Sequence, residues 1–263
     1  MAGRVGGGAS FAAAGGLALM APLAFVGVGV VAGVQADGSE GSGAAGLAAT
    51  LEAASGSFGW AVLALLGVAV LDVVVACALW TVFRAERPGA AALAAAFRIA
   101  YAAVFVGAIA MLADARRIAD EGAGGASGLG IDDRDLAVLS RLDGFDAAWN
   151  AGLVLFGVHL AVIGWLLLRR PGGFAVVVGV LVLVAGAGYL ADSVLGVLAP
   201  DGPAVAQYTF IGEIVLIAWL VVGGIRSIRA DRELVAHATQ PEAVLAAVDA
   251  RAARADATEG ARR

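Results

Sequence analysis

Apolar residues fill six long stretches of this chain, and shorter polar segments separate them. The stretches cover residues 11–36, 58–83, 88–112, 145–168, 174–199 and 204–225. Each is long enough to cross a bilayer as a helix, which takes roughly 20 mostly apolar residues. Backbone groups in hydrocarbon must bond within their own segment, and the period-two alternation of an outer-membrane barrel is absent. The pattern predicts an all-α polytopic membrane protein, a bundle of six transmembrane helices whose partner is the lipid bilayer.

Composition agrees with this class, because 61% of the residues are hydrophobic and only 15% are charged. An ordinary soluble domain carries many more charges. No basic stripe with interleaved aromatic residues indicates a nucleic-acid partner. We expect one membrane domain over residues 1–226 and a cytoplasmic tail over residues 227–263 that is helical or partly disordered. A homo-oligomer is compatible with the sequence, which contains nothing that specifies one.

Basic residues are unevenly distributed between the two ends of the predicted spans. All of them are arginines, and pairs or triplets follow spans two, four and six, beginning at Arg84, Arg169 and Arg226. The segments after spans one and five contain none, so the positive-inside rule predicts that both termini are cytoplasmic. In the outer segments we expect a short helix at 47–54 and a separate surface helix at 132–142, capped by Asp132 or Asp133.

The first span also has an alternative interpretation as a cleaved signal peptide. Val34, Gln35 and Ala36 form a small-x-small site, and Arg4 gives a weak positive region. The apolar stretch is much longer than the roughly 7 to 15 residues of a signal core. We therefore expect the span to be retained.

Four ionisable residues lie deep inside the predicted spans and at similar depth. At 1.5 Å per residue from the cytoplasmic flank, Asp72 and Glu213 lie about 18 and about 19 Å in, and Arg98 and His159 about 15 Å in. A very short turn joins spans two and three, so Asp72 and Arg98 are predicted to be direct partners. Tyr101 follows Arg98 by three residues on the same helix face. These five residues are predicted to form a polar core, since ionisable groups in a membrane are costly and usually functional.

A second set of polar residues is expected nearer the outer surface, as a vestibule above the core. It consists of Asp146, Asn150, Tyr189, Asp192 and Gln207. The alternative for both sets is helix packing, because interhelical hydrogen bonds and small residues such as Gly157 and Gly186 are common in membrane bundles.

The predicted core contains two carboxyl groups and one fixed positive charge. Either His159 takes a proton or one carboxyl group keeps one, and histidine is the group whose titration falls nearest physiological pH. No cofactor motif is present, and Cys77 and the two histidines are too few for a histidine-rich zinc site, so no metal is expected. A carboxylate-rich metal site using Asp72, His159 and Glu213 stays chemically possible, although an arginine competes for those side chains. An intramembrane enzyme using His159 with Glu213 or Asp192 stays open, although the chain lacks a recognisable nucleophile.

Several short motifs together resemble a known family. They include Leu71-Asp72-Val73, Phe97-Arg98, the glycine-flanked run that ends at His159, Tyr189 with Asp192, and Gly212-Glu213. This ordered series, over roughly residues 58–224, is similar to the bacterial domain-of-unknown-function family numbered four-three-eight-six. The resemblance implies a six-span membrane protein with the same polar positions that depth counting gives, and it implies no activity, cofactor or substrate. We expect the protein in the bacterial inner membrane.

Three functions remain open from the sequence. The first is a non-enzymatic protein whose core binds or passes a small solute or a proton, as the buried charges indicate. The second is the intramembrane enzyme, and the third is a structural or regulatory membrane subunit. We expect the first.

Overall fold

The computed structural model describes residues 2–40, 46–121, 130–198 and 209–238, and all of its regular structure there is helical. The helices are α1 (Ala2–Glu40), α2 (Leu47–Ala53), α3 (Ser55–Phe83), α4 (Pro88–Asp120), α5 (Ile131–Leu168), α6 (Gly173–Leu198) and α8 (Ile211–Ala238). Six of them, all except α2, are long and apolar enough to cross a membrane. The predicted six-span, all-α architecture is confirmed within these ranges.

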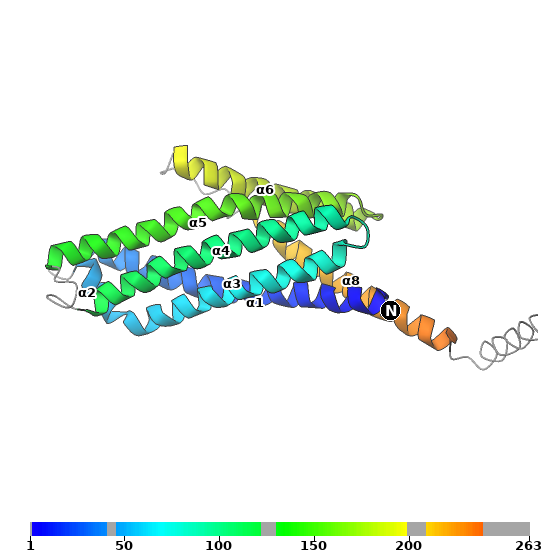
Figure 1. The fold of residues 1–263 in the computed structure, drawn as a ribbon, viewed down its shortest axis with the longest axis horizontal. Helices are drawn as coiled ribbons and strands as arrows, with labels where there is room; N and C mark the ends of the chain where they lie inside the picture. Colours follow the sequence, from blue (N-terminus) through cyan, green and yellow to red (C-terminus); the bar gives the residue numbers. More distant parts are fainter. Residues whose placement is uncertain (1, 41–45, 122–129, 199–208, 239–263) are drawn as a thin grey trace, which may run out of the picture.

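The six long helices form a closed ring in chain order. Each packs against the next, from α1 through α3, α4, α5 and α6 to α8, and α8 packs back against α1. Figure 1 shows the elongated bundle, with α8 running past the N-terminus at one end. The contacts of α1 with both α3 and α8 complete the ring.

Inward and outward faces of the ring differ in polarity less than in a soluble bundle. On α3 the buried stripe runs through Leu65, Val68 and Asp72, and the opposite face exposes Trp60 and Val70 at 74% and 65%. A soluble helix would carry polar residues on its exposed face. Apolar side chains on the outer face are those expected to contact lipid.

The helices α5 and α6 approach closely because glycines face one another. A Cβ on Gly157 would lie 2.9 Å from the carbonyl oxygen of Gly186, and a Cβ on Gly164 would lie 2.8 Å from that of Gly179. The two pairs are seven residues apart on both helices, so one stripe makes both contacts. This is the small-residue packing of membrane helices, and it accounts for Gly157 and Gly186.

Turns define the two ends of the bundle. At the arginine-rich end, the α3–α4 and α5–α6 turns lie next to α8, and Gly172 adopts the positive φ of +108° that the second turn requires. At the opposite end, which we call the α2 end, α2 packs on α1, α3, α4 and α5. This helix confirms the short element expected at 47–54.

Helix boundaries at the α2 end differ from those expected from the sequence. Residues 132–142 are not a separate surface helix but the first part of the continuous α5, whose N-cap is Gly130 without a side-chain cap. No proline interrupts this segment, and α4 also continues to Asp120 beside it. At 1.5 Å per residue, the 38 residues of α5 span about 57 Å, well beyond a hydrocarbon core of about 30 Å. At the other end, α8 continues as a helix to Ala238, into the segment expected to be a helical or partly disordered tail.

Candidate functional site

Arg98 lies at the centre of the ring and organises the polar core. Its side chain on α4 reaches three other helices, and it is fully buried. Nη2 lies 2.7 Å from Oδ1 of Asp72 on α3, and the side chains of both residues are 0% exposed. The ion pair expected from the short α3–α4 turn is therefore present. Nη2 also lies 3.6 Å from the sulfur of Met20 on α1, across the ring.

His159 on α5 is fixed by contacts to both ring nitrogens. Nε2 lies 3.2 Å from Nη1 of Arg98, and Nδ1 lies 2.8 Å from the carbonyl oxygen of Ala94. A guanidinium can only donate and a carbonyl can only accept. Nε2 therefore accepts and Nδ1 donates, which is the neutral tautomer assigned from its partners.

Apolar and aromatic groups surround this pair, so its charges are largely removed from solvent. The Arg98 guanidinium lies 5.2 Å from the ring centre of Phe156, one turn before His159 on α5. Beyond the ion pair, the Asp72 oxygens and Nε of Arg98 have no hydrogen-bond partner within the part of the chain that the structure describes. Unpaired acceptor capacity in a buried carboxylate is costly. The core thus contains polar atoms whose hydrogen-bonding capacity the described side chains do not satisfy.

Glu213 on α8 forms the second polar contact of the core. The Tyr189 hydroxyl on α6 donates to its Oε1 at 2.7 Å. The Tyr189 ring meets Phe156 edge to face at 5.1 Å, so a single aromatic residue connects the two polar groups. Glu213 lies within electrostatic range of both Arg98 and Asp72.

Tyr101, the fifth predicted core residue, faces the ring interior, but its hydroxyl group is hydrogen-bonded to Trp149, which was not among the predicted core residues. Its ring stacks on Phe105 and packs against Phe156, and its hydroxyl accepts a hydrogen bond from Nε1 of Trp149 at 3.1 Å. The structure thus connects Asp72, Arg98 and His159 directly. Tyr101 extends the aromatic wall on the α4–α5 side.

The described residues that were expected to line an outer vestibule make separate contacts, each with a different partner. Asp146 accepts a hydrogen bond from Nε2 of Gln35 at 3.2 Å, and the backbone carbonyl of Asn150 accepts one from the Ser193 hydroxyl at 2.9 Å. Asp192 precedes Ser193 on α6 and is half-buried. Gln207 lies outside the described residues. Tyr189 belongs with Glu213 in the core, a correction to its placement in the outer set.

Sequence reasoning missed the residues that insulate the core. Phe156 contacts Arg98, His159 and Tyr189, and Met20 contacts Arg98 from α1. The spacing of Phe156 and His159, three residues apart on one helix, could have indicated the first. An apolar methionine in the first span carries no comparable signal.

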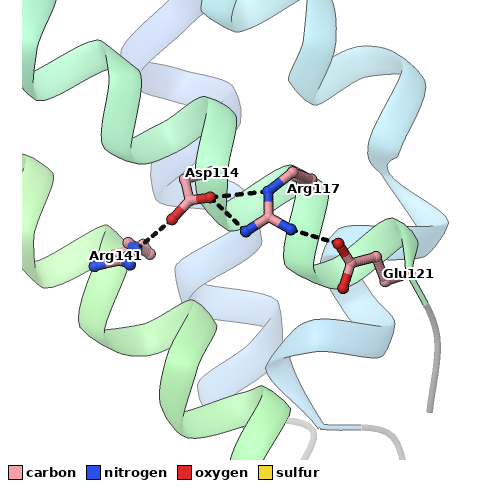
Figure 2. A network of polar contacts seen from close by, with 4 residues as sticks. All are labelled: Asp114, Arg117, Glu121 and Arg141. Carbon is pink, nitrogen blue, oxygen red and sulfur yellow. Dashed lines mark hydrogen bonds and ion pairs between the residues drawn. The ribbon is translucent and has the colours of Figure 1, made fainter. Parts of the chain in front are cut away.

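A second charged cluster lies at the α2 end, where α4 and α5 extend together (Figure 2). Asp114 accepts hydrogen bonds from Arg117 at 3.0 and 2.8 Å and from Arg141 at 2.6 Å, and Arg117 also contacts Glu121. Its arginine side chains are 59% and 47% exposed. Among the described residues, no group of three or more histidine, cysteine or acidic side chains is arranged to hold a metal ion.

Comparison with known proteins agrees with this architecture. An uncharacterized protein of Archaeoglobus fulgidus is 28% identical over 155 residues, which cover 59% of this chain and 78% of the relative. No solved structure matches the chain. The family model described as "Domain of unknown function (DUF4386)" matches residues 13–224, so the match begins within α1, well before residue 58 where the sequence resemblance was expected to start. The matched segment includes residues of all six spanning helices and the whole polar core, and the chain therefore belongs to this family.

Proposed function

We propose that this protein is an integral membrane protein whose polar core binds one proton, carried by Glu213 beside the Asp72–Arg98 ion pair. The observation that carries the proposal is a charge count. Two carboxyl groups within electrostatic range of each other share a single guanidinium, and the bonding of His159 makes its imidazole neutral. An isolated surplus charge at this depth is costly. One bound proton balances the core.

Glu213 is the member best suited to carry that proton. Asp72 faces Arg98 at 2.7 Å, a contact that favours its ionised form. His159 would have to point an N–H at a guanidinium donor if it became charged. Glu213 contacts a neutral hydroxyl, which can donate to either form of a carboxyl group.

A proton is supported over a larger solute by the positions of the cavities. Four cavities of about 270 to 460 Å³ lie toward the ends of the bundle, and none of these four is lined by Asp72, Arg98, His159 or Glu213. Small-molecule sites are concave, with a few polar groups converging on the ligand. A proton needs no such space.

The competing enzymatic hypothesis draws less support from the geometry. A general base must have a free lone pair within reach of its substrate. Both nitrogens of His159 are engaged, one with Arg98 and one with the Ala94 carbonyl. Acid–base work by His159 with Glu213 or Asp192 would require one of those contacts to break first.

Infrared difference spectroscopy tests the proposal directly. In the purified full-length protein at pH 7, a protonated carboxyl group gives a carbonyl band distinct from that of a carboxylate. We expect the band in the wild type, its loss in Glu213→Gln, and its retention in Asp143→Asn, a matched change at an exposed acid. Absence of the band from the wild type, or its persistence in Glu213→Gln, would refute the assignment.

We also propose that both termini face the cytoplasm of a bacterial inner membrane, because arginines concentrate at one end of the bundle. In a Cys77→Ala background, Leu136→Cys at the α2 end should react with an impermeant thiol reagent added to intact cells. Its side chain is 65% exposed. Ala230→Cys on α8, also exposed, should react only after lysis. The reverse labelling pattern would show that the termini face the opposite side of the membrane.

A further inference from the structure

A small cavity opens at the arginine-rich end of the bundle, apart from the polar core. Its volume is about 270 Å³, and it lies between the α3–α4 turn, the α5–α6 turn and α8. Charged walls are provided by Arg170, Arg226 and Glu86, and apolar walls by Phe174, Trp219 and Val222. Cavities with this mixture of basic and apolar walls, at the end of a membrane bundle, suit an amphiphilic anion.

One face of α8 supplies the apolar wall and ends in a positive charge. Trp219, Val222, Gly223 and Arg226 follow the spacing i, i+3, i+4 and i+7, so they form one stripe along the helix. The stripe is apolar from Trp219 to Gly223 and becomes basic at Arg226, which lies about 10 Å beyond Trp219 along the axis. This order matches a lipid, whose acyl chain joins a charged headgroup.

Arg170 is held rigidly on the other side of the cavity. Its Nη2 donates to the Val82 carbonyl at 2.8 Å and lies 3.1 Å from Glu86, and its Nε donates to Glu86 at 3.2 Å. The guanidinium lies 4.6 Å from the ring centre of Phe83 and 5.1 Å from that of Trp219. Among the described residues these contacts leave Nη1 to donate to a ligand. An arginine fixed before binding loses little entropy when it bonds a phosphate.

The surroundings add positive charge and aromatic groups typical of a membrane interface. Arg87 and Arg169 both lie 5.1 Å from the ring centre of Trp165, and Arg84 lies 4.7 Å from that of Trp80. Tryptophan and arginine mark the level of the lipid headgroups. The acid in the cavity wall, Glu86, is 52% exposed and already bonded to Arg170.

We propose that this cavity binds the phosphate headgroup of an anionic phospholipid. Arg170 and Arg226 donate to the phosphate oxygens, and an acyl chain lies along Phe174, Trp219 and Val222. A guanidinium recognises phosphate through parallel N–H donors. The proposal does not depend on the protonation of Glu213, which is more than one helical turn away on the other side of Trp219.

Lipid binding to the purified full-length protein tests this inference, by native mass spectrometry and by thermal unfolding in a neutral detergent. The probes are phosphatidylglycerol, phosphatidylcholine and inorganic phosphate. Arg226→Gln removes one donor, and Gly223→Leu fills the cavity without changing charge, since a Cβ at Gly223 meets nothing within 4 Å. The matched controls are Arg229→Gln, an exposed arginine outside the cavity, and Gly107→Leu, an exposed glycine with equal space on α4.

We expect phosphatidylglycerol to bind and stabilise the wild type more than phosphatidylcholine does. Its affinity should fall about fivefold in Arg226→Gln, from the loss of one arginine near the headgroups, and at least as far in Gly223→Leu. Both controls should bind like the wild type. Equal binding of the two lipids, or equal losses in Arg226→Gln and Arg229→Gln, would overturn the site. Equal stabilisation by inorganic phosphate would overturn the lipid assignment in favour of a free anion. If Arg226→Gln fails to fold, the lipid affinities of Gly223→Leu and Gly107→Leu are compared instead, and equal affinities would overturn the site.

Discussion

The two arginine–aspartate contacts at the centre and at the α2 end of the bundle have nearly the same length. Arg98 lies 2.7 Å from Asp72, and Arg141 lies 2.6 Å from Asp114. The first pair has no exposed side-chain surface, whereas the side chains of the second are 47% and 30% exposed. Surroundings, and not distance, set the free energy of an ion pair, because water screens the exposed one and compensates either partner when the other is lost.

The difference in surroundings corresponds to a difference in role. The exposed cluster links α4 to α5 where both helices extend beyond the length of a bilayer core (Figure 2). The buried pair links α4 to α3 and, through His159 and Met20, to α5 and α1. The buried pair has a nearby carboxyl group, Glu213, that makes its charge count unequal, whereas the four residues of the exposed cluster are two acids and two arginines.

Breaking the buried pair should have the largest effect on stability. Arg98→Gln leaves Asp72 as an uncompensated buried charge, at a cost of about 3 to 5 kcal/mol of the free energy of unfolding. The double variant Asp72→Asn/Arg98→Gln should recover part of that loss. Thermal unfolding of the purified protein in detergent compares Arg98→Gln, Asp72→Asn and the double variant with the wild type. Strictly additive losses would mean that the two residues are not coupled.

Removing the imidazole should have the next largest effect. His159→Phe deletes the acceptor for Arg98 and the donor to the Ala94 carbonyl, which leaves buried groups unsatisfied at a cost of about 1 to 3 kcal/mol. His159→Gln keeps a side-chain acceptor and donor at the position, so it should lose less. Equal melting temperatures for both variants and the wild type would contradict the neutral, doubly bonded imidazole.

Deleting the tyrosine hydroxyl should cost less still. Tyr189→Phe removes one hydrogen bond to Glu213, worth about 1 kcal/mol. It should also shift the carbonyl infrared band assigned to Glu213. Tyr101→Phe is the matched control, since its hydroxyl bonds Trp149 and should leave the band unchanged. If the band shifts equally in both variants, the Tyr189 hydroxyl is not the specific partner of the protonated carboxyl group.

The exposed cluster should be the least sensitive. Arg141→Gln removes a surface contact worth up to about 1 kcal/mol, and added salt should reduce the difference from the wild type further. The melting temperatures of both proteins at low and high salt measure this. A loss as large as that of Arg98→Gln, or one independent of salt, would remove the distinction between the two pairs.

Much of the fold could be predicted because a bilayer restricts the possible structures so strongly. Six apolar stretches gave six spanning helices, and the rise of 1.5 Å per residue placed Asp72, Arg98 and His159 at one depth. The extensions of α4 and α5 were not foreseen, since hydropathy reports where a helix leaves the hydrocarbon and not where it ends. Their polar residues are stabilised by contacts between the helices, such as that of Arg141 with Asp114.

The pairing of core residues could be predicted only in part. A short turn makes α3 and α4 neighbours, which was enough to pair Asp72 with Arg98. Tyr189 was placed nearer the outer surface by its position on α6, yet its long side chain and the inclination of the helices bring its hydroxyl to Glu213. Depth counting along straight helices does not include either effect.

The measurement that tests the central claim most directly compares the same chemical change at two carboxyl groups of the polar core. Glu213→Gln replaces a protonated acid with an amide that still accepts from Tyr189, so it should cost no more than about 1 kcal/mol. Asp72→Asn removes the charge that pairs with Arg98 and should cost about 3 to 5 kcal/mol. Thermal unfolding of both variants at pH 7 in one detergent gives the difference. Equal losses would show that Glu213 is ionised like Asp72, and would contradict a proton bound in the core.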